Sequence, residues 1–162
     1  MDTQTFAVRQ LHPMNVARHS HASVAVQDSV FVISGFAENM WILNSVERYN
    51  HQTGQWANVA PLNVALSLVG AAVLNDVIYV VGGHGIIVEC YVNGQDKWTP
   101  CTPMIEARRQ PAVAALNGYL YVIGGLTNWA EDLLTMERFD PVTDTWSKVR
   151  IALFINHKMK PS

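Results

Sequence analysis

A glycine pair follows an apolar run in the stretch DVIYVVGGHG, residues 76–85, and is the first feature that could do chemistry. A glycine-rich turn after a buried strand can hold a phosphate when it opens a helix, because free backbone N–H groups then face the anion. No helical period and no lysine follow Gly82 and Gly83, and the next residues, HGIIVECY, read as another strand. The pair therefore favours a structural turn, and we expect no cofactor.

Histidine and cysteine are the next candidates, because both can bind metals. His19 and His21 alternate along one expected strand and would share a face, with His84 as the best third ligand. The spacing fixes no third ligand, so surface roles are favoured over zinc. Cys90 and Cys101 fit no CxxC spacing, and no neighbouring base would activate a thiol. We expect the two cysteines to be close neighbours and reduced.

Length and charge narrow the class of protein. The chain has 162 residues and a formal net charge of -2, which gives no electrostatic case for binding nucleic acid or an anionic membrane. Its apolar stretches fall short of the roughly 20 residues that a bilayer span needs. The N-terminal stretch MDTQTFAVRQ lacks the basic start and apolar core of a signal peptide. These features predict a cytoplasmic protein.

A threefold internal repeat positions all of these residues. The stretches SVFVISG, VIYVVGG and YLYVIGG align at residues 29–35, 77–83 and 119–125. Downstream of each comes Glu-x-aromatic, and seven residues after each aromatic comes a tryptophan. The aromatic columns contain Tyr49, Tyr91 and Phe139, then Trp56, Trp98 and Trp146. Three columns in register indicate a repeat architecture.

Each unit reads as four short strands separated by turn residues. In the first unit the expected strands cover 20–26, 29–34, 45–50 and 55–59. Tight polar turns join the first two strands of each unit, at 27–28, 75–76 and 117–118, and the last of these is an Asn-Gly pair.

This combination of four strands, a double glycine and a spaced aromatic–tryptophan pair resembles the kelch motif. The resemblance implies an all-β fold, a partial β-propeller of three four-stranded kelch blades plus one orphan N-terminal strand. The implied segments are an orphan outer strand (1–12), three repeats (13–60, 61–102 and 103–150) and a non-repeat tail (151–162). Ser34 replaces a motif glycine in the first unit, and the second unit is shorter between its second and third strands.

Residues that recur in every unit are expected to be structural. The glutamates of the Glu-x-aromatic columns should hold turns or neighbouring strands. The repeated aromatics should pack between blades, and the glycines should end second strands; this structural set is Gly35, Gly82, Gly83, Gly124, Gly125, Tyr49, Tyr91, Phe139, Trp56, Trp98 and Trp146.

Residues outside the repeat columns are the candidates for function. Trp41 and Trp129 lie in long connections between strands two and three, where a loop tryptophan either anchors a partner or folds back on its blade. The segments before each first strand emerge on the same rim of a propeller, and arginine there suits carboxylate recognition. The predicted partner-binding rim contains Arg18, His19, Ser20, Trp41, Ser67, His84, Arg108, Arg109, Gln110 and Trp129.

Three blades cannot close a ring, because closed propellers have about four to eight. The open flanks would expose strand edges and apolar faces. One hypothesis is that the chain is a truncated or alternatively spliced product of a longer propeller protein. Such a product would either have no function of its own or pair with a longer kelch relative. The other is two copies that associate to complete a six-bladed ring.

The family resemblance also suggests functions. Similar kelch proteins often carry a BTB domain before the propeller and act as substrate adaptors for cullin-3 ubiquitin ligases. The resemblance therefore implies a protein-interaction module with a protein or peptide partner, and without that helical domain the chain would not recruit a ligase directly. Actin binding is the alternative interaction role. Some kelch propellers are oxidases, sugar epimerases or lyases, but the incomplete ring and the missing metal constellation favour a non-enzymatic protein.

Overall fold

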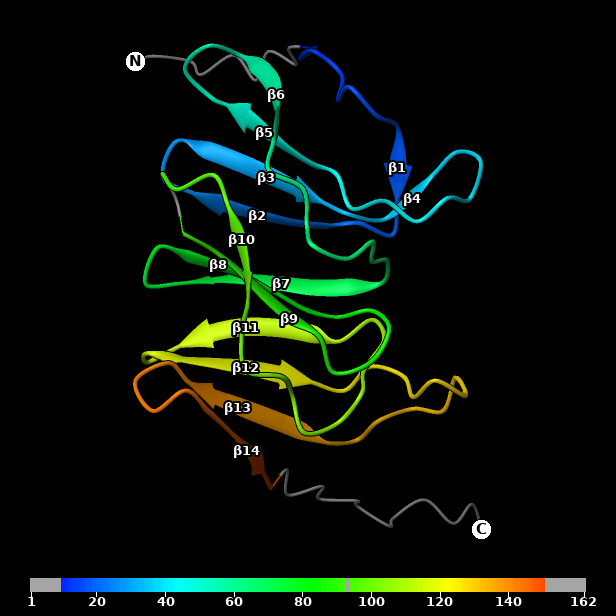
Figure 1. The fold of residues 1–162 in the computed structure, drawn as a ribbon, viewed down its shortest axis with the longest axis vertical. Helices are drawn as coiled ribbons and strands as arrows, with labels where there is room; N and C mark the ends of the chain where they lie inside the picture. Colours follow the sequence, from blue (N-terminus) through cyan, green and yellow to red (C-terminus); the bar gives the residue numbers. More distant parts are fainter. Residues whose placement is uncertain (1–9, 93, 151–162) are drawn as a thin grey trace, which may run out of the picture.

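The computed structural model describes residues 10–92 and 94–150 of the chain. Within these residues the structure consists of strands and turns, and no helix in them is long and apolar enough to cross a membrane. Three four-stranded antiparallel sheets follow one another along the molecule (Figure 1). The expected all-β partial propeller of three four-stranded blades is therefore confirmed.

In each sheet the neighbouring strands follow one another along the chain, except that the short strand β4 (Phe36–Ala37) lies outside the sheet between β3 and β5, and this order is expected for a propeller blade. Blade 1 contains β2 (Ala22–Val26), β3 (Ser29–Ile33), β5 (Val46–Asn50) and β6 (Gln55–Val59). Blade 2 contains β7 (Val69–Leu74), β8 (Val77–Gly82), β9 (Val88–Val92) and β10 (Trp98–Pro100). Blade 3 contains β11 (Ala112–Leu116), β12 (Tyr119–Ile123), β13 (Met136–Asp140) and β14 (Thr145–Val149). A small extra pair, β1 (Arg18–His19) with β4 (Phe36–Ala37), lies beside blade 1.

Two-residue turns set the register of the first hairpin in every blade. The flanking residues pair directly across the turn, as in Val26 with Ser29 and Leu116 with Tyr119. The first turn residue has a positive φ in each blade, at Gln27, Asn75 and Asn117. Positive φ at this position matches the right-handed twist of the flanking strands.

Glycine ends the second strand where the chain touches the segment leading into the first strand. Gly35, Gly83 and Gly125 have φ of 99°, 91° and 92°. A Cβ atom on them would lie 2.6, 2.8 and 2.6 Å from the carbonyl oxygens of His19, Ser67 and Arg109. Side chains cannot be accommodated at such distances, so the second glycine of the motif is a steric requirement of this turn.

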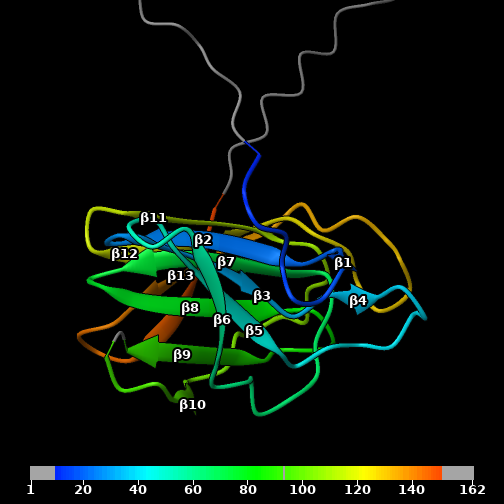
Figure 2. The ribbon, with the colours of Figure 1, turned by 90° about the horizontal axis from the view of Figure 1, so that it is seen from above.

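The blades pack face to face through two apolar clusters. The first strands β2, β7 and β11 lie along one side of the stack and β9 and β10 along the other (Figure 2), with β7 in contact with both β2 and β11. One cluster lies between blades 1 and 2 and the other between blades 2 and 3. A ring pair crosses each junction, Phe31 with Tyr91 at 5.4 Å and Tyr79 with Phe139 at 5.8 Å between centroids.

The expected orphan strand at 1–12 falls mostly outside the described residues, and its described part, 10–12, is not a strand. The expected tail, 151–162, lies wholly outside them.

The expectation of two free thiols is corrected by the structure, which joins Cys90 and Cys101 in a disulfide. Cys90 pairs across the strands with Thr99, so Cys101, two residues further on, lies diagonally opposite Cys90 on the same face. Their Cα atoms are 6.2 Å apart, within the range that a disulfide spans.

Candidate partner-binding rim

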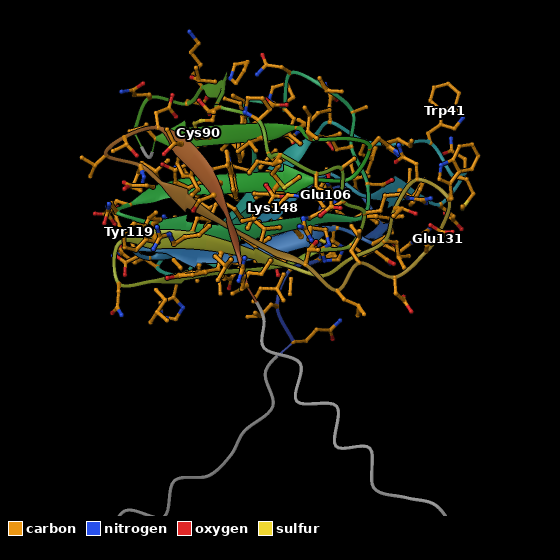
Figure 3. All side chains as sticks on the ribbon, turned by 90° about the horizontal axis from the view of Figure 1, so that it is seen from below. Trp41, Cys90, Glu106, Tyr119, Glu131 and Lys148 are labelled. Carbon is orange, nitrogen blue, oxygen red and sulfur yellow. A yellow bond between two sulfur atoms is a disulfide. The ribbon has the colours of Figure 1, made fainter. Side chains whose placement is uncertain are left out.

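One end of the blades carries the connections between second and third strands together with the segments that lead into the first strands. Figure 3 shows Trp41 and Glu131 at this end and Tyr119 at the opposite end. The connections run from residue 34 to 45 in blade 1 and from 124 to 135 in blade 3, and only from 83 to 87 in blade 2. We call this end the loop rim.

Arg18 is not exposed on the loop rim, although the sequence predicted a partner-binding role for it. Its side chain is fully buried and forms an ion pair with Glu47 at 2.7 Å. Its guanidinium also donates to the backbone carbonyls of Ser34 and Ser45, and to the Ser45 hydroxyl. Glu47 in turn accepts bonds from the backbone N–H groups of residues 15 and 16. Arg18 thus ties the loop of blade 1 to its own third strand.

Arg108 repeats this arrangement in blade 3. Its side chain is fully buried and pairs with Glu137 at 3.1 Å, while Glu106, 29% exposed, lies 3.0 Å away. The guanidinium donates to the carbonyls of Gly124 and Thr135. Glu137 accepts the N–H groups of residues 105 and 106, as Glu47 does in blade 1.

Blade 2 replaces the arginine with Leu66, which is fully buried. The buried carboxylate of Glu89 is held instead by Asn63, whose side-chain amide donates at 2.5 Å and whose backbone N–H donates at 3.0 Å. An uncharged amide thus takes over part of the hydrogen bonding that the arginine provides in blades 1 and 3.

The prediction of a partner-binding role is therefore wrong for three of the rim residues, because their side chains are buried. Arg18 and Arg108 have no exposed side-chain surface, and Ser67 is likewise buried. For the two arginines the physical reason is that each guanidinium turns inward to pair with the glutamate of the third strand. Among the described residues, this leaves no exposed arginine column on the loop rim.

Trp41 and Trp129 are the most exposed large hydrophobic side chains of the loop rim among the described residues, at 73% and 87%. Each lies in a tight turn of the same design, in which Met40 and Ala130 have φ of 64° and 62°. The N–H of Ala37 bonds to the carbonyl of Trp41, and the N–H of Thr127 bonds to that of Glu131. The two turns therefore present a tryptophan to solvent from blades 1 and 3, rather than folding it back on the blade.

The remaining predicted rim residues are at the surface or close to it. His19, Ser20, His84 and Gln110 are exposed, and Arg109 is half-buried. The ring of His19 stacks on Phe36, with 5.3 Å between centroids.

Ser20 and Gln110 also have a backbone role. Both have positive φ, as does Leu68 at the same position of blade 2. The N–H of Leu68 bonds to the carbonyl of Ser20, and that of Gln110 to the carbonyl of Leu68. These bonds link the entries of neighbouring first strands, so the φ > 0 conformation is part of the blade-to-blade connection.

The histidines considered as metal ligands do not come together. Within the described residues, no group of three or more His, Cys, Asp or Glu side chains is placed to hold a metal ion. Partial burial of the ring and the nearby positive charge of Arg18 lower the pKa of His21 below its ordinary value of 6.5. A lowered pKa keeps this ring neutral near neutral pH.

The arginine–glutamate pairing was not recognised from the sequence, which assigned the glutamates to structure and the arginines to the rim. The signal was present, because Arg18 and Arg108 each precede their glutamate by 29 residues. A charged residue at a fixed interval from a repeated buried glutamate indicates an internal ion pair.

Comparisons with known proteins agree with this fold. The kelch motif family matches residues 17–63 and 107–150, more than half of the chain. Over 91 residues the chain is 33% identical to the kelch-like protein terF of Aspergillus terreus, which covers 54% of this chain and 20% of the relative. Over 75 residues it is 35% identical to human kelch-like protein 38 (46% and 13%), and over 72 residues 39% identical to mouse kelch-like protein 35 (44% and 12%).

These matches span only about an eighth to a fifth of the relatives' length. One assignment follows from the two matched repeats, the three four-stranded blades, and the glycines and ring pairs that recur from blade to blade. The chain belongs to the kelch-repeat family.

Proposed function

We propose that the loop rim binds a segment of a partner protein, with Trp41 and Trp129 as its anchors. The observation that carries this proposal is the exposure of both rings, 73% and 87%, on turns of the same design. Burying such a side chain removes a large apolar surface from water, and tryptophan is enriched among the residues that dominate binding energy. Kelch repeats support a protein-interaction role in general.

The charges beside the tryptophans suggest the chemistry of the partner segment. Glu38, Glu131 and Asp132 are exposed at or next to the two turns, whereas Arg18 and Arg108 are neutralised inside the blades. Arginine or lysine side chains can pair with these carboxylates and stack on the indole faces. The proposed partner segment is therefore basic and apolar, the opposite of the acidic segment that exposed arginines would have selected.

The biological role proposed for this binding is substrate recognition within a kelch-like ubiquitin ligase adaptor of the cullin-3 type. The similarity of this chain to kelch-like proteins supports this role, which is proposed for the cytoplasm. Binding rather than catalysis is the proposed activity. The three buried glutamates of the repeat support this choice, because they already accept hydrogen bonds from backbone N–H groups.

The experiment is a comparison of captured proteins. The chain and its W41A/W129A double variant are used as bait in cell extract, and the most enriched protein is then purified for a dissociation constant. We expect at least tenfold weaker binding by the double variant, and unchanged binding by the control V142A, which alters an exposed apolar residue (91%) in the turn between β13 and β14 at the other end of the blade. Equal binding by W41A/W129A and the unaltered chain would exclude the loop rim.

The adaptor role has a separate test. Overproduction of the chain should lengthen the half-life of the captured protein, because the chain would compete with the longer adaptor that presents it for ubiquitination. An unchanged half-life, with binding to the rim intact, would contradict the adaptor role alone.

A further inference from the structure

Blade 2 differs from its neighbours in its outer strand. β10 forms three register pairs with β9, whereas β6 and β14 each form five pairs with the third strand of their own blade. The three pairs end at Pro100, which has no N–H group to donate. Leu66 also replaces the buried arginine that supports blades 1 and 3. Two noncovalent supports of the other blades are therefore reduced or missing in blade 2.

The disulfide lies at the end of this short ladder. The N–H of Cys101 donates to the carbonyl of Val88, and the bond to Cys90 then joins β9 to the segment directly after β10. Both cysteines of the chain lie in this blade, and the equivalent positions of blade 1 hold Arg48 and Val59. A covalent link between third and fourth strands thus occurs where the noncovalent pairing is shortest.

The segment that the disulfide holds, residues 98–104, carries side chains of both blade junctions. Trp98 is 3% exposed in the cluster between blades 1 and 2, and Met104 is 2% exposed in the cluster between blades 2 and 3. Between them, the carbonyl of Thr102 accepts the indole N–H of Trp146 from blade 3 at 2.8 Å. Movement of this segment away from β9 would therefore loosen both junctions.

The position of the two cysteines allows small molecules to approach them. Both are half-buried, and the neighbouring Thr99 and Pro100 are exposed. β9 and β10 lie on the side of the stack opposite the first strands (Figure 2). Disulfides in cytoplasmic proteins are usually transient and catalytic or redox-sensing. In a chain proposed for the cytoplasm, a half-exposed pair favours reversible oxidation over a permanent bond.

We propose that Cys90 and Cys101 are a site of reversible oxidation by a small thiol–disulfide couple of the glutathione class, and that the bond holds the outer strand of blade 2 in place. In the oxidised chain the covalent link adds to the three register pairs of β10. In the reduced chain those pairs and the Cys101 N–H bond remain as the backbone pairing of residues 98–101 with β9, so this segment opens more often. The proposal goes beyond partner binding and is independent of the loop rim, because it uses residues of the outer strands.

The exchange takes place in two steps. The thiolate of one cysteine attacks a sulfur atom of glutathione disulfide, which forms a mixed disulfide and releases one glutathione thiolate. The other cysteine thiolate then attacks the protein sulfur of the mixed disulfide, which forms the Cys90–Cys101 bond and releases the second glutathione thiolate. The two protons lost by the cysteines pass to the released glutathiones. Two protein thiols and one glutathione disulfide thus become one protein disulfide and two glutathione thiols, and reduction is the reverse.

Redox equilibration of the purified chain tests the exchange. The chain is incubated with glutathione disulfide or with reduced glutathione at the cytoplasmic concentration, free thiols are alkylated, and the intact mass is measured. We expect a complete disulfide in the first buffer, two free thiols in the second, and full reversal when the buffers are exchanged. A bond that persists in reduced glutathione, or a pair that glutathione disulfide does not oxidise, would overturn the proposal.

Single variants test the intermediate. C90S and C101S each retain one thiol, so the reaction with glutathione disulfide should stop at the mixed disulfide and add the mass of one glutathione. Absence of this adduct from both variants would contradict the two-step exchange.

Hydrogen exchange of the unaltered chain tests whether the bond holds the outer strand. Amides of residues 98–104 should exchange at least tenfold faster in the reduced chain than in the oxidised chain, and amides of β3 in blade 1 should change far less. The melting temperature should fall by about 5–10 °C on reduction. The matched control C90S/C101S should behave like the reduced chain in both buffers. Equal exchange in the two states, or an equal response of C90S/C101S to the buffers, would refute the role of the bond.

Discussion

Replacing Arg108 by leucine tests whether the rim arginines are internal supports. The change removes a guanidinium that is paired with Glu137 at 3.1 Å and bonded to the carbonyls of Gly124 and Thr135. Removing one partner of a buried ion pair leaves the other charge without compensation and costs about 3–5 kcal/mol of unfolding free energy. At about 2–4 °C per kcal/mol for a chain of this length, the melting temperature should fall by about 6–20 °C.

Blade 2 provides the design of a compensating change. Leu66 occupies the arginine position there, and Asn63 supplies the amide that binds Glu89. Ile105 holds the position of Asn63 in blade 3, where its backbone N–H already donates to Glu137. The double variant R108L/I105N should therefore recover part of the lost stability, because the new amide can donate to the carboxylate that R108L leaves unpaired.

Urea and thermal unfolding, followed by tryptophan fluorescence and circular dichroism, measure both variants beside the unaltered chain. I105N alone is the control, since Ile105 is 51% exposed and its replacement should change stability by less than about 0.5 kcal/mol. The reasoning would be refuted if R108L melted within about 2 °C of the unaltered chain, or if it weakened partner binding without loss of stability.

Two further predictions concern single residues. W98A should lower the free energy of unfolding by about 3–5 kcal/mol in urea titrations, because Trp98 is only 3% exposed and its indole N–H bonds to the carbonyl of Ala60. W41A should change the free energy of unfolding by less than about 0.5 kcal/mol. Equal losses in the two variants would contradict the assignment of Trp98 to the core and Trp41 to the rim. The lowered pKa of His21 means that the unfolded chain binds a proton more readily than the folded one, so stability should be complete above pH 6.5 and fall as the pH drops through that value. Urea unfolding of H21Q between pH 5 and 8 should show a shallower decline, and an identical pH profile would exclude His21 as a contributor.

The blades could be predicted from the sequence because local signals agree with one another. The strands of the first unit, expected at 29–34, 45–50 and 55–59, lie at Ser29–Ile33, Val46–Asn50 and Gln55–Val59. Two-residue turns punctuate the chain where strands must reverse, and the aromatic columns recur at fixed intervals. Periodicity of this kind reports backbone pairing and the face on which a side chain lies.

The rim was harder to predict, because a segment's place on the rim does not give the direction of its side chains. Arg18 and Arg108 lie in segments on the rim, yet their guanidinium groups turn inward to glutamates 29 residues away in the chain. Only the three-dimensional pairing of the first-strand entry with the third strand reveals this direction. The disulfide was missed for a different reason: the two cysteines were expected to be close neighbours, but a reducing cytoplasm was expected to keep them as thiols, whereas the structure joins them where β9 and β10 pair.

The internal arginines also explain why two units of one chain can differ so strongly on the rim. A buried guanidinium needs a carboxylate and several carbonyls around it, and the long loops of blades 1 and 3 provide these carbonyls at residues 34 and 45 and at 124 and 135. Blade 2 has a short loop, and there Leu66 and Asn63 stand in for the arginine. The same long loops carry Trp41 and Trp129 to solvent, so the ion pair that stiffens each loop base also supports the exposed anchor at its tip. A variant such as R108L should therefore weaken partner binding only through loss of fold, whereas W129A should weaken binding with the fold intact.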